Sequence, residues 1–484
     1  MKIKAFSCCL FILLLCTHIV GAGPTATNSP AIPINEEEEW LGMYFKGEKL
    51  GFSYSKMKRL PDSIVLDNKV FFQFQVGGAN QTTSFAQKSV LGLDLKPKSF
   101  SLVQEITGHR QQVEGKRKNG KLNLKVTSAG YEKKKSTAFP AGATLSSTFL
   151  ANILAEGLEV GKRGSIPVFI ESFQVMSELK YQIVREEVFP YQGEKVETFV
   201  VAYNLSGMDS TLWITREGVL MQEIMRQGFE LKKEPEAIAR RMGESNFTAS
   251  NFITLSMVKL DKQLKDSEKI RHLQLRLSRV PSGQGIPEDH RQKLLKTEKL
   301  PDGSHAVTLR VSSEPKGGHK KETSIGAGDF LGDSASVQTH HPKIKKMSRR
   351  LVRGASDPLK AALRINRWVF SNMEKAMVDS TTALDALNEK RGECQSHTYL
   401  YTALARAAGI PTKIVNGLVY SPHYGGFLYH AWPEVFVGEW RALDPTFGQD
   451  EVDATHIKLT AGAEENPLQL MGFIGKLEIE ILEQ

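Results

Sequence analysis

Cysteine is scarce in this chain of 484 residues, and its four cysteines are unevenly placed. Cys8, Cys9 and Cys16 lie close to the N-terminus, so removal of a leader there would leave Cys394 as the single thiol. A chain with one thiol can form no internal disulfide, which excludes a disulfide-stabilised fold. Isolated cysteines are commonly inert and buried, but a lone thiol in an exported protein is open to oxidation. Its retention therefore favours a functional role for Cys394.

Long apolar runs are absent after the N-terminus. The run at residues 6–15 follows two lysines and precedes Val20-Gly21-Ala22, which is the pattern of a secretory signal peptide cleaved after residue 22. A membrane anchor is the alternative, but this run is short for crossing a bilayer. The sequence therefore predicts an exported protein with no transmembrane segment in the mature chain.

Recognisable metal, cofactor and nucleic-acid motifs are also lacking. His319, His340 and His341 have no partner at the spacing of a metal site, so we interpret them as surface histidines. No acidic loop has the pattern of a calcium site, and no nucleic-acid-binding motif is present. We therefore expect no metal ion, no organic cofactor and no nucleic-acid partner.

Acidic residues are too few to balance the basic ones. The net charge is +9, or +7 once Lys2 and Lys4 leave with the signal peptide. Basic clusters at residues 116–118, 133–135 and 343–346 supply much of this charge. A solvated basic surface is the simpler interpretation. The alternative is that the charge draws the protein to anionic cell-envelope components.

Changes in composition indicate a multidomain chain, which its length also favours. Short alternating apolar runs, separated by turn-forming pairs such as Asn119-Gly120, predict an antiparallel β-rich domain with a helical interlude near residues 145–158. The predicted segments are, in order, a signal peptide at 1–22, a flexible tether at 23–39, the β-rich domain at 40–250, a second β segment at 251–314, a linker at 315–329 and a C-terminal domain at 330–484.

The C-terminal domain contains the residues with evident chemical potential. Residues 395–408 carry apolar side chains at helical spacing, and Gly409 and Pro411 would end this helix. Cys394 then falls at or just before the helix N-terminus. Backbone N–H groups and the helix dipole there favour the thiolate and could also hold a developing oxyanion.

Cys394, His430 and Asp444 follow one another in the order that suits a thiol nucleophile, its general base and the group that orients the base. His397 and His456 are rival bases. His397 lies three residues into the same helix as Cys394, where its side chain should point past the thiol. We therefore favour His430 as the base.

The turn between two predicted strands, 427–437 and 440–447, tests this triad. A two-residue loop would turn the Asp444 side chain to the face of the sheet opposite His430, because side chains alternate along a strand. The triad therefore requires a three-residue loop or a β-bulge, for which Pro433 is a candidate position.

Several motifs of this region occur together and in order, and they resemble the transglutaminase-like superfamily, the papain-related cysteine fold of bacterial secreted proteins. The resemblance covers roughly the last third of the chain and implies an α+β fold for residues 330–484. It also implies that Cys394 is the nucleophile, His430 the base and Asp444 its partner. The β-rich part resembles domains that precede this enzyme type. The motifs are Gly392-Glu393-Cys394, residues 405–411, His430-Ala431-Trp432-Pro433-Glu434-Val435, Asp444-Pro445-Thr446 and residues 453–459.

The triad and the resemblance together predict a cysteine-dependent acyl-transfer enzyme that acts as a protease or amidase on a peptide or protein substrate. Two alternatives stay open. One is a transglutaminase that transfers the acyl group to an amine, since access of water or amine, not the triad, decides between the two reactions. The other is a non-catalytic scaffold whose β domains bind an envelope partner. Because the relatives are bacterial, the resemblance implies a periplasmic location.

Overall fold

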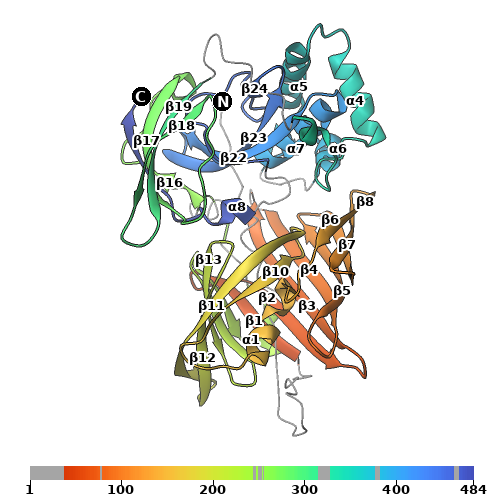
Figure 1. The fold of residues 1–484 in the computed structure, drawn as a ribbon, viewed down its shortest axis with the longest axis vertical. Helices are drawn as coiled ribbons and strands as arrows, with labels where there is room; N and C mark the ends of the chain where they lie inside the picture. Colours follow the sequence, from red (N-terminus) through yellow and green to blue (C-terminus); the bar gives the residue numbers. More distant parts are fainter. Residues whose placement is uncertain are drawn as a thin grey trace. The chain divides into compact units, whose positions relative to one another are not determined.

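The structure is a computed structural model that describes residues 38–484, except 77–78, 244–246, 249–252, 254–255, 314–326, 377–381 and 463–467. The predicted signal peptide, nearly all of the predicted tether and most of the predicted linker lie outside the described residues. The chain divides into two compact units, one ending at Thr248 and one running from Ala249 to Gln484 (Figure 1). The second unit includes both the second β segment and the C-terminal region of the sequence prediction. None of the described helices is long and apolar enough to cross a membrane.

The first unit contains one sheet of 15 strands, which confirms the expected β-rich N-terminal part. Neighbours in sequence pair antiparallel, except that β9 pairs parallel with β10 and that β8 and β9 stand at opposite ends of the sheet order. The first and last strands of this unit along the chain, β1 and β15, pair with each other in the middle of the sheet. The elements are β1 (Glu38–Phe45), β2 (Glu48–Arg59), β3 (Ile64–Val76), β4 (Ala79–Leu91), β5 (Pro97–Ile106), β6 (His109–Lys118), β7 (Lys121–Ser128), β8 (Tyr131–Ala138), β9 (Thr144–Leu145), η2 (Ser146–Thr148), α1 (Phe149–Ala155), β10 (Arg163–Ile170), β11 (Val175–Tyr191), β12 (Glu194–Leu205), β13 (Met208–Ile214), β14 (Leu220–Met225), β15 (Phe229–Lys233) and α2 (Glu236–Ala239).

Local sequence explains these elements. Along β7 the buried and exposed residues alternate, which is the period of a strand with one face on a core. Asn119 and Gly120 have φ values of +50° and +70° and form the two-residue turn between β6 and β7. That backbone is the one Asn-Gly turns favour, so the predicted turn is confirmed. The helical interlude corresponds to η2 and α1.

The second unit contains a five-stranded sheet in the order β16-β23-β22-β25, with β24 also paired to β23, and a four-stranded sheet in the order β18-β19-β17-β26. Its elements are β16 (Val258–Lys259), η3 (Ser267–Lys269), β17 (His272–Val280), β18 (Gln292–Lys299), β19 (His305–Ser312), η4 (Ala327–Leu331), α4 (Pro342–Val352), α5 (Pro358–Asn372), β20 (Glu374–Lys375), α6 (Ala383–Glu389), β21 (Arg391–Gly392), α7 (Cys394–Ala407), β22 (Thr412–Ser421), β23 (Gly426–Phe436), β24 (Trp440–Ala442), β25 (Ile457–Ala461), α8 (Leu468–Met471) and β26 (Glu478–Glu483).

Helix α7 is the centre of this unit. Leu400 and Leu404 are fully buried and share a core cluster with Ile365 of α5 and Val435 of β23. A helix that is buried on most of its surface needs apolar or small residues, or polar side chains that have partners. In α7 the buried Arg406 donates to the backbone oxygen of Thr412. Gly409 follows it with φ +80°, so the predicted helix end is confirmed.

Candidate active site

Cys394 is the first residue of α7, with Glu393 as the N-cap. Gly392 precedes it with φ +147°, a conformation that favours glycine, and pairs with Lys375 between the short parallel strands β21 and β20. The thiol therefore lies where the N–H groups of the first turn and the positive end of the helix dipole are directed. This is the helix-terminal position that the sequence predicts.

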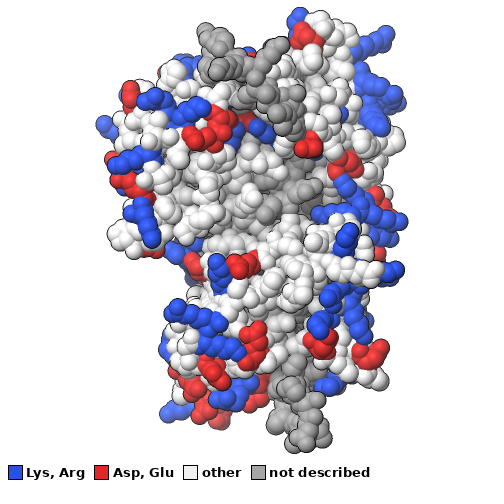
Figure 2. Space-filling model, in the orientation of Figure 1, with Lys and Arg blue, Asp and Glu red and all other residues white. Residues whose placement is uncertain are grey.

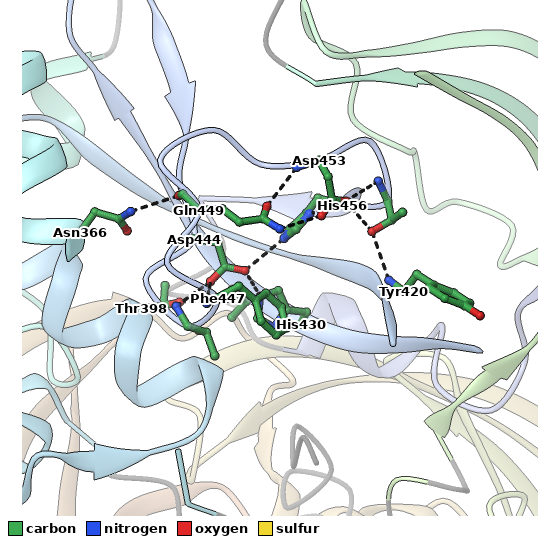
Figure 3. Close-up of polar contacts among 12 residues, drawn as sticks. Asn366, Thr398, Tyr420, His430, Asp444, Phe447, Gln449, Asp453 and His456 are labelled. Atoms are coloured by element: carbon green, nitrogen blue, oxygen red, sulfur yellow. Dashed lines mark hydrogen bonds and ion pairs between the residues drawn. The ribbon is translucent and has the colours of Figure 1, made fainter. Parts of the chain in front are cut away.

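A hydrogen bond between two elements fixes Cys394 relative to the sheet. Thr398, one turn into α7, donates from Oγ1 to the carbonyl oxygen of Ala431 at 2.9 Å, and both residues are buried. Ala431 follows His430 in β23, so this contact ties the helix that carries the thiol to the strand that carries the imidazole (Figure 3). The two catalytic candidates are thus held by rigid elements.

The hairpin that follows has the loop length the triad requires. Phe436 pairs with Trp440 and Glu434 with Ala442, which leaves a three-residue loop at 437–439. In this register the side chains of His430 and Asp444 point to the same face of the sheet. The pairing of β23 with β22 runs through Pro433 without a shift, so the bulge considered at that position is not needed.

The last predicted strand is shorter than the sequence suggests. It was expected to span 440–447, but β24 ends at Ala442. Pro445 cannot donate to a strand ladder, and Oδ1 of Asp444 accepts hydrogen bonds from the N–H groups of Thr446 at 2.7 Å and Phe447 at 3.1 Å. The Asp444 side chain therefore organises a turn at this point and is fixed by it.

His430 and Asp444 are in direct contact. Nε2 of His430 lies 2.8 Å from Oδ2 of Asp444, and both side chains are fully buried (Figure 3). Burial lowers the pKa of His430, but the charge and hydrogen bond of Asp444, followed by those of Cys394, outweigh burial and leave this pKa raised. Because Nε2 is engaged by Asp444, the other ring nitrogen is the one available to the thiol. The structure therefore brings the three predicted residues together.

His456 is a member of this centre that the sequence suggested only as a rival base. Its Nε2 lies 3.1 Å from the same Oδ2 atom of Asp444, and its Nδ1 lies 3.3 Å from Oδ1 of Asp453. Burial lowers the pKa of His456, but the charge of Asp453 and the hydrogen bonds to both carboxylates raise it to about 9. Burial raises the pKa of Asp444, yet His430 and His456 hold it far below its usual range. His456 therefore contacts the acid of the triad and not the thiol.

His397, the other alternative to His430 as general base, has an environment that does not suit that role. It is fully buried, and its Nδ1 lies 2.8 Å from the backbone oxygen of Glu393. Burial lowers its pKa to about 4, so the ring is neutral at physiological pH. Trp432 is also fully buried, stacked on His430 with ring centroids 6.0 Å apart. Trp432 therefore packs inside the domain against His430 and does not line a surface groove.

The surroundings of the thiol are apolar and closed. Cys394 has no exposed surface and shares a buried cluster with Ile253, Leu428 and Ala431. Partly buried side chains pack against this cluster, namely Met257, Tyr424 and Phe447. The sulfur is therefore closed off from solvent by these side chains. Such burial is also what an inert thiol would show, and the polar chain to His430 and Asp444 is what distinguishes Cys394 from one.

One cation lies beside the centre. Nζ of Lys375 is 4.9 Å from the centroid of the Phe447 ring. Burial lowers the pKa of Lys375, while the negative charges of Asp444 and Glu393 oppose that shift. Lys375 is thus close enough to both carboxylates to contribute to the electrostatics of the site.

Three of these side chains also satisfy the geometry of a metal site. The ligand atoms of His430, Asp444 and His456 all lie within 4.8 Å of one another. The same atoms are joined by the two hydrogen bonds to Oδ2 of Asp444, which a metal ion would have to replace. A hydrogen-bonded network accounts for the arrangement with every ring donor directed at a carboxylate.

Comparisons with known proteins place the site in a family. Residues 345–445, which include Cys394, His430 and Asp444, match the family model of the transglutaminase-like superfamily. An uncharacterized protein of Mycobacterium leprae is 27% identical over 132 residues, which make up 25% of this chain and 45% of that protein. This chain therefore spans less than half the length of that relative.

Among solved structures, a "Putative Cysteine Protease" from Cytophaga hutchinsonii matches with 16% identity and a TM-score of 0.30 over 44% of this chain and 83% of that chain. A "Putative Protease" from Parabacteroides distasonis has 11% identity and a TM-score of 0.19 over 77% of this chain and 67% of that chain. The family-model match is the finding that confirms the resemblance noted in the sequence. The chain therefore contains, at residues 345–445, a domain of the transglutaminase-like superfamily.

Proposed function

We propose that the protein is a cysteine-dependent hydrolase that cleaves peptide or amide bonds through Cys394, His430 and Asp444. One observation carries this proposal. A buried thiol at a helix N-terminus, an imidazole with a raised pKa and a carboxylate 2.8 Å from that imidazole form one continuous polar chain. Each member supplies the group that nucleophilic acyl transfer needs. The superfamily to which the domain belongs supports a cysteine-dependent enzyme.

The proposed reaction has two half-steps. His430 takes the proton from Cys394, and Asp444 holds the resulting imidazolium through Nε2. The thiolate attacks the carbonyl carbon and forms a C–S bond, the N–H groups at the start of α7 bind the oxyanion, and His430 returns the proton to the leaving amine as the C–N bond breaks. Water then attacks the thioester with His430 as base, which releases the acid and restores the thiolate.

Hydrolysis and acyl transfer differ in the nucleophile that attacks the thioester after the first amine has left. An amine acceptor in place of water would make the protein a cross-linking transferase, with no change in the triad. We favour hydrolysis because the described residues show no dedicated amine-binding group beside Cys394. A non-catalytic scaffold would need no aligned nucleophile, base and acid, so the hydrogen-bonded triad argues against it.

Alkylation of the single thiol of the mature chain tests the catalytic proposal. We would measure the rate of iodoacetamide modification of Cys394 against pH by intact mass, in the wild type and in His430→Ala. We expect a thiolate midpoint well below the ordinary value of about 8.5 in the wild type, and a rise toward that value in the variant. Modification in denaturant gives the reference for an unperturbed thiol. Equal midpoints in both proteins would contradict the triad and favour the scaffold. If the midpoints differ as expected, peptide and amine substrates would separate hydrolysis from transfer.

The proposed location is the periplasm, with anionic cell-envelope components as a second class of partner. Helix α4, which the sequence analysis did not predict, carries a basic surface that would serve this role. None of its members forms an ion pair with a described residue, and all are exposed, gathered at the edge of the molecule where α4 lies (Figures 1 and 2). We call this set the α4 basic surface: Lys343, Lys345, Lys346, Arg349, Arg350 and Arg353.

A further inference from the structure

The carboxylate of the triad is shared between two imidazole rings. Oδ2 of Asp444 lies 2.8 Å from Nε2 of His430 and 3.1 Å from Nε2 of His456. Both nitrogens of the His456 ring face carboxylates, since its Nδ1 lies 3.3 Å from Oδ1 of Asp453. A ring between two carboxylates is favoured as the doubly protonated cation, which donates from both nitrogens. His456 therefore faces Asp444 as an imidazolium.

The segment that carries His456 is closed on itself by a ring of hydrogen bonds. Asp444 and Gln449 exchange backbone hydrogen bonds, both at 2.9 Å. The Gln449 side chain donates to Oδ2 of Asp453 at 2.8 Å and accepts from the Asp453 N–H at 3.0 Å. Asp453 holds His456, and His456 returns to Asp444 (Figure 3). Each link joins residues of one loop, so the position of Oδ2 depends on the whole ring.

Asp453 is itself fixed by three further hydrogen bonds, one of which comes from outside this loop. Its Oδ1 also accepts from the N–H of Thr455 at 2.8 Å and from the Thr455 hydroxyl at 2.6 Å. Its backbone oxygen accepts from Nη2 of Arg291 at 3.1 Å. The carboxylate that faces His456 therefore has little freedom to turn away, and it holds the ring in one orientation.

We propose that His456, oriented by Asp453, is a positioning residue that holds Oδ2 of Asp444 against His430 and offsets part of the negative charge that Asp444 presents to that ring. This inference rests on the proposed function. The charge matters because His430 must give up its proton to the leaving amine, and an uncompensated buried carboxylate would hold that proton too strongly. The His456 imidazolium, bound to the same oxygen, weakens the attraction of Asp444 for the His430 proton and keeps the carboxylate in place.

Other titratable groups face this network and belong in any interpretation of its pH dependence. Cys394 faces His430 from α7, and His397 lies in the same helix. Lys375 interacts with Asp444 from β20. The rings of His430, Trp432 and Phe447 also lie near His456, and the last two carry no charge.

Three variants separate the two proposed effects of His456, which are to position the Asp444 carboxylate and to supply a positive charge beside it. His456→Ala removes both, His456→Gln keeps a donor toward Asp444 without the charge, and Asp453→Asn removes the partner that keeps the ring charged. We expect His456→Ala to lower peptide turnover roughly 10–100-fold through misplacement of Asp444. His456→Gln should recover most of that rate. His456→Gln and Asp453→Asn, which leave Asp444 in place, should move the alkaline limb of the activity profile to higher pH, because His430 then keeps its proton more strongly.

A matched control measures generic damage to this buried region. Thr460→Val lies in β25, just after His456, and its hydroxyl makes no hydrogen bond in the described structure. It should leave the rate and both pH limbs unchanged. Nitrogen-15 NMR of the histidine rings at pH 7.5, with His456→Gln to assign the signal, should show both nitrogens of His456 protonated.

The outcomes distinguish this inference from the proposed function. If His430→Ala shifts the thiolate midpoint but neither His456→Gln nor Asp453→Asn moves the alkaline limb, the role of His456 is wrong and the triad stands. If His430→Ala has no effect, the proposed function itself fails. A neutral His456 ring at pH 7.5 would overturn the inference. So would stoichiometric zinc in the purified protein that a chelator removes together with activity, since the three ligand atoms would then hold a metal ion.

Discussion

At the residue scale, each member of the proposed triad has its own role, and a substitution of Asp444 tests its role most directly. In Asp444→Asn the amide oxygen can still accept from the N–H groups of Thr446 and Phe447, so the turn should remain folded. The charge that raises the pKa of His430 is lost, and burial then lowers that pKa. We expect turnover to fall by roughly 10³–10⁴-fold and the thiolate midpoint of Cys394 to rise.

The measurements are kcat/KM on a peptide substrate and the alkylation profile, with circular dichroism to show that the fold persists. A variant that keeps its turnover within tenfold of the wild type would remove Asp444 from the mechanism.

The same scale shows what the sequence could and could not predict about the site. Cys394, His430 and Asp444 lie in recognisable motifs, and their order was enough to propose roles that the geometry supports. The role of His456 was missed because it depends on a loop that folds back through Gln449 and Asp453. The signal that could have found it is an aspartate and a histidine three residues apart, in the segment 453–459 that resembles bacterial members.

At the scale of elements, the β23–β24 hairpin sets which face Asp444 occupies. Deletion of Arg441 removes one residue of β24, so every later side chain turns to the opposite face. Deletion of Val437 shortens only the loop and leaves Gly438-Glu439, a pair suited to a two-residue turn with glycine first. We expect the first deletion to give the alkylation profile of His430→Ala, and the second to keep the wild-type profile.

Both variants lose one residue at adjacent sites, so the pair controls for general disruption. The alkylation midpoint and the thermal unfolding curve are the two readouts. Equal loss of activity in the two deletions, at equal stability, would show that register is not what places Asp444.

Elements were predicted where local signals were strong. The end of α7 at Gly409 and the Asn119-Gly120 turn follow from backbone preferences, and both are present. The length of β24 was overestimated because the side-chain hydrogen bonds of Asp444 end the strand. Residue propensities for strand or helix do not predict such side-chain hydrogen bonds. Helix α4 was not predicted, since its many cations obscure the apolar residues that face the core.

At the scale of the whole molecule, the described structure predicts how stability depends on pH. The pKa of His456 is raised to about 9 in the folded state. The contribution of His456 to the free energy of unfolding is therefore fully present below the unfolded pKa of about 6.5, and it is lost as pH rises to 9. The pKa of Asp453 is lowered to about 2, so its contribution is present above about 4 and is lost as pH falls toward 2. His397, with a pKa of about 4, adds a loss as pH falls from 6.5 to 4.

Stability of the second unit should therefore be greatest near pH 6 to 7 and decline on both sides. Urea unfolding of the wild type and His456→Gln across this range is the measurement. The alkaline decline should disappear in the variant, a difference of at most roughly 3 kcal/mol between pH 6.5 and 9. Parallel curves for the two proteins would mean that His456 is not charged in the folded state.

The chain has a net positive charge, and the α4 basic surface makes the proposed envelope binding testable. Each exposed lysine or arginine near an anionic bilayer contributes about 1 kcal/mol, so reversal of four charges should abolish binding. We expect the wild type to bind phosphatidylglycerol vesicles at low salt and to dissociate as salt rises, in sedimentation assays. A variant with Lys345, Lys346, Arg349 and Arg350 changed to glutamate should remain unbound. A control with four exposed lysines of the first unit reversed, Lys116, Lys118, Lys121 and Lys195, has the same net charge and should still bind. Equal loss of binding in both variants would assign the attraction to overall charge and not to this helix.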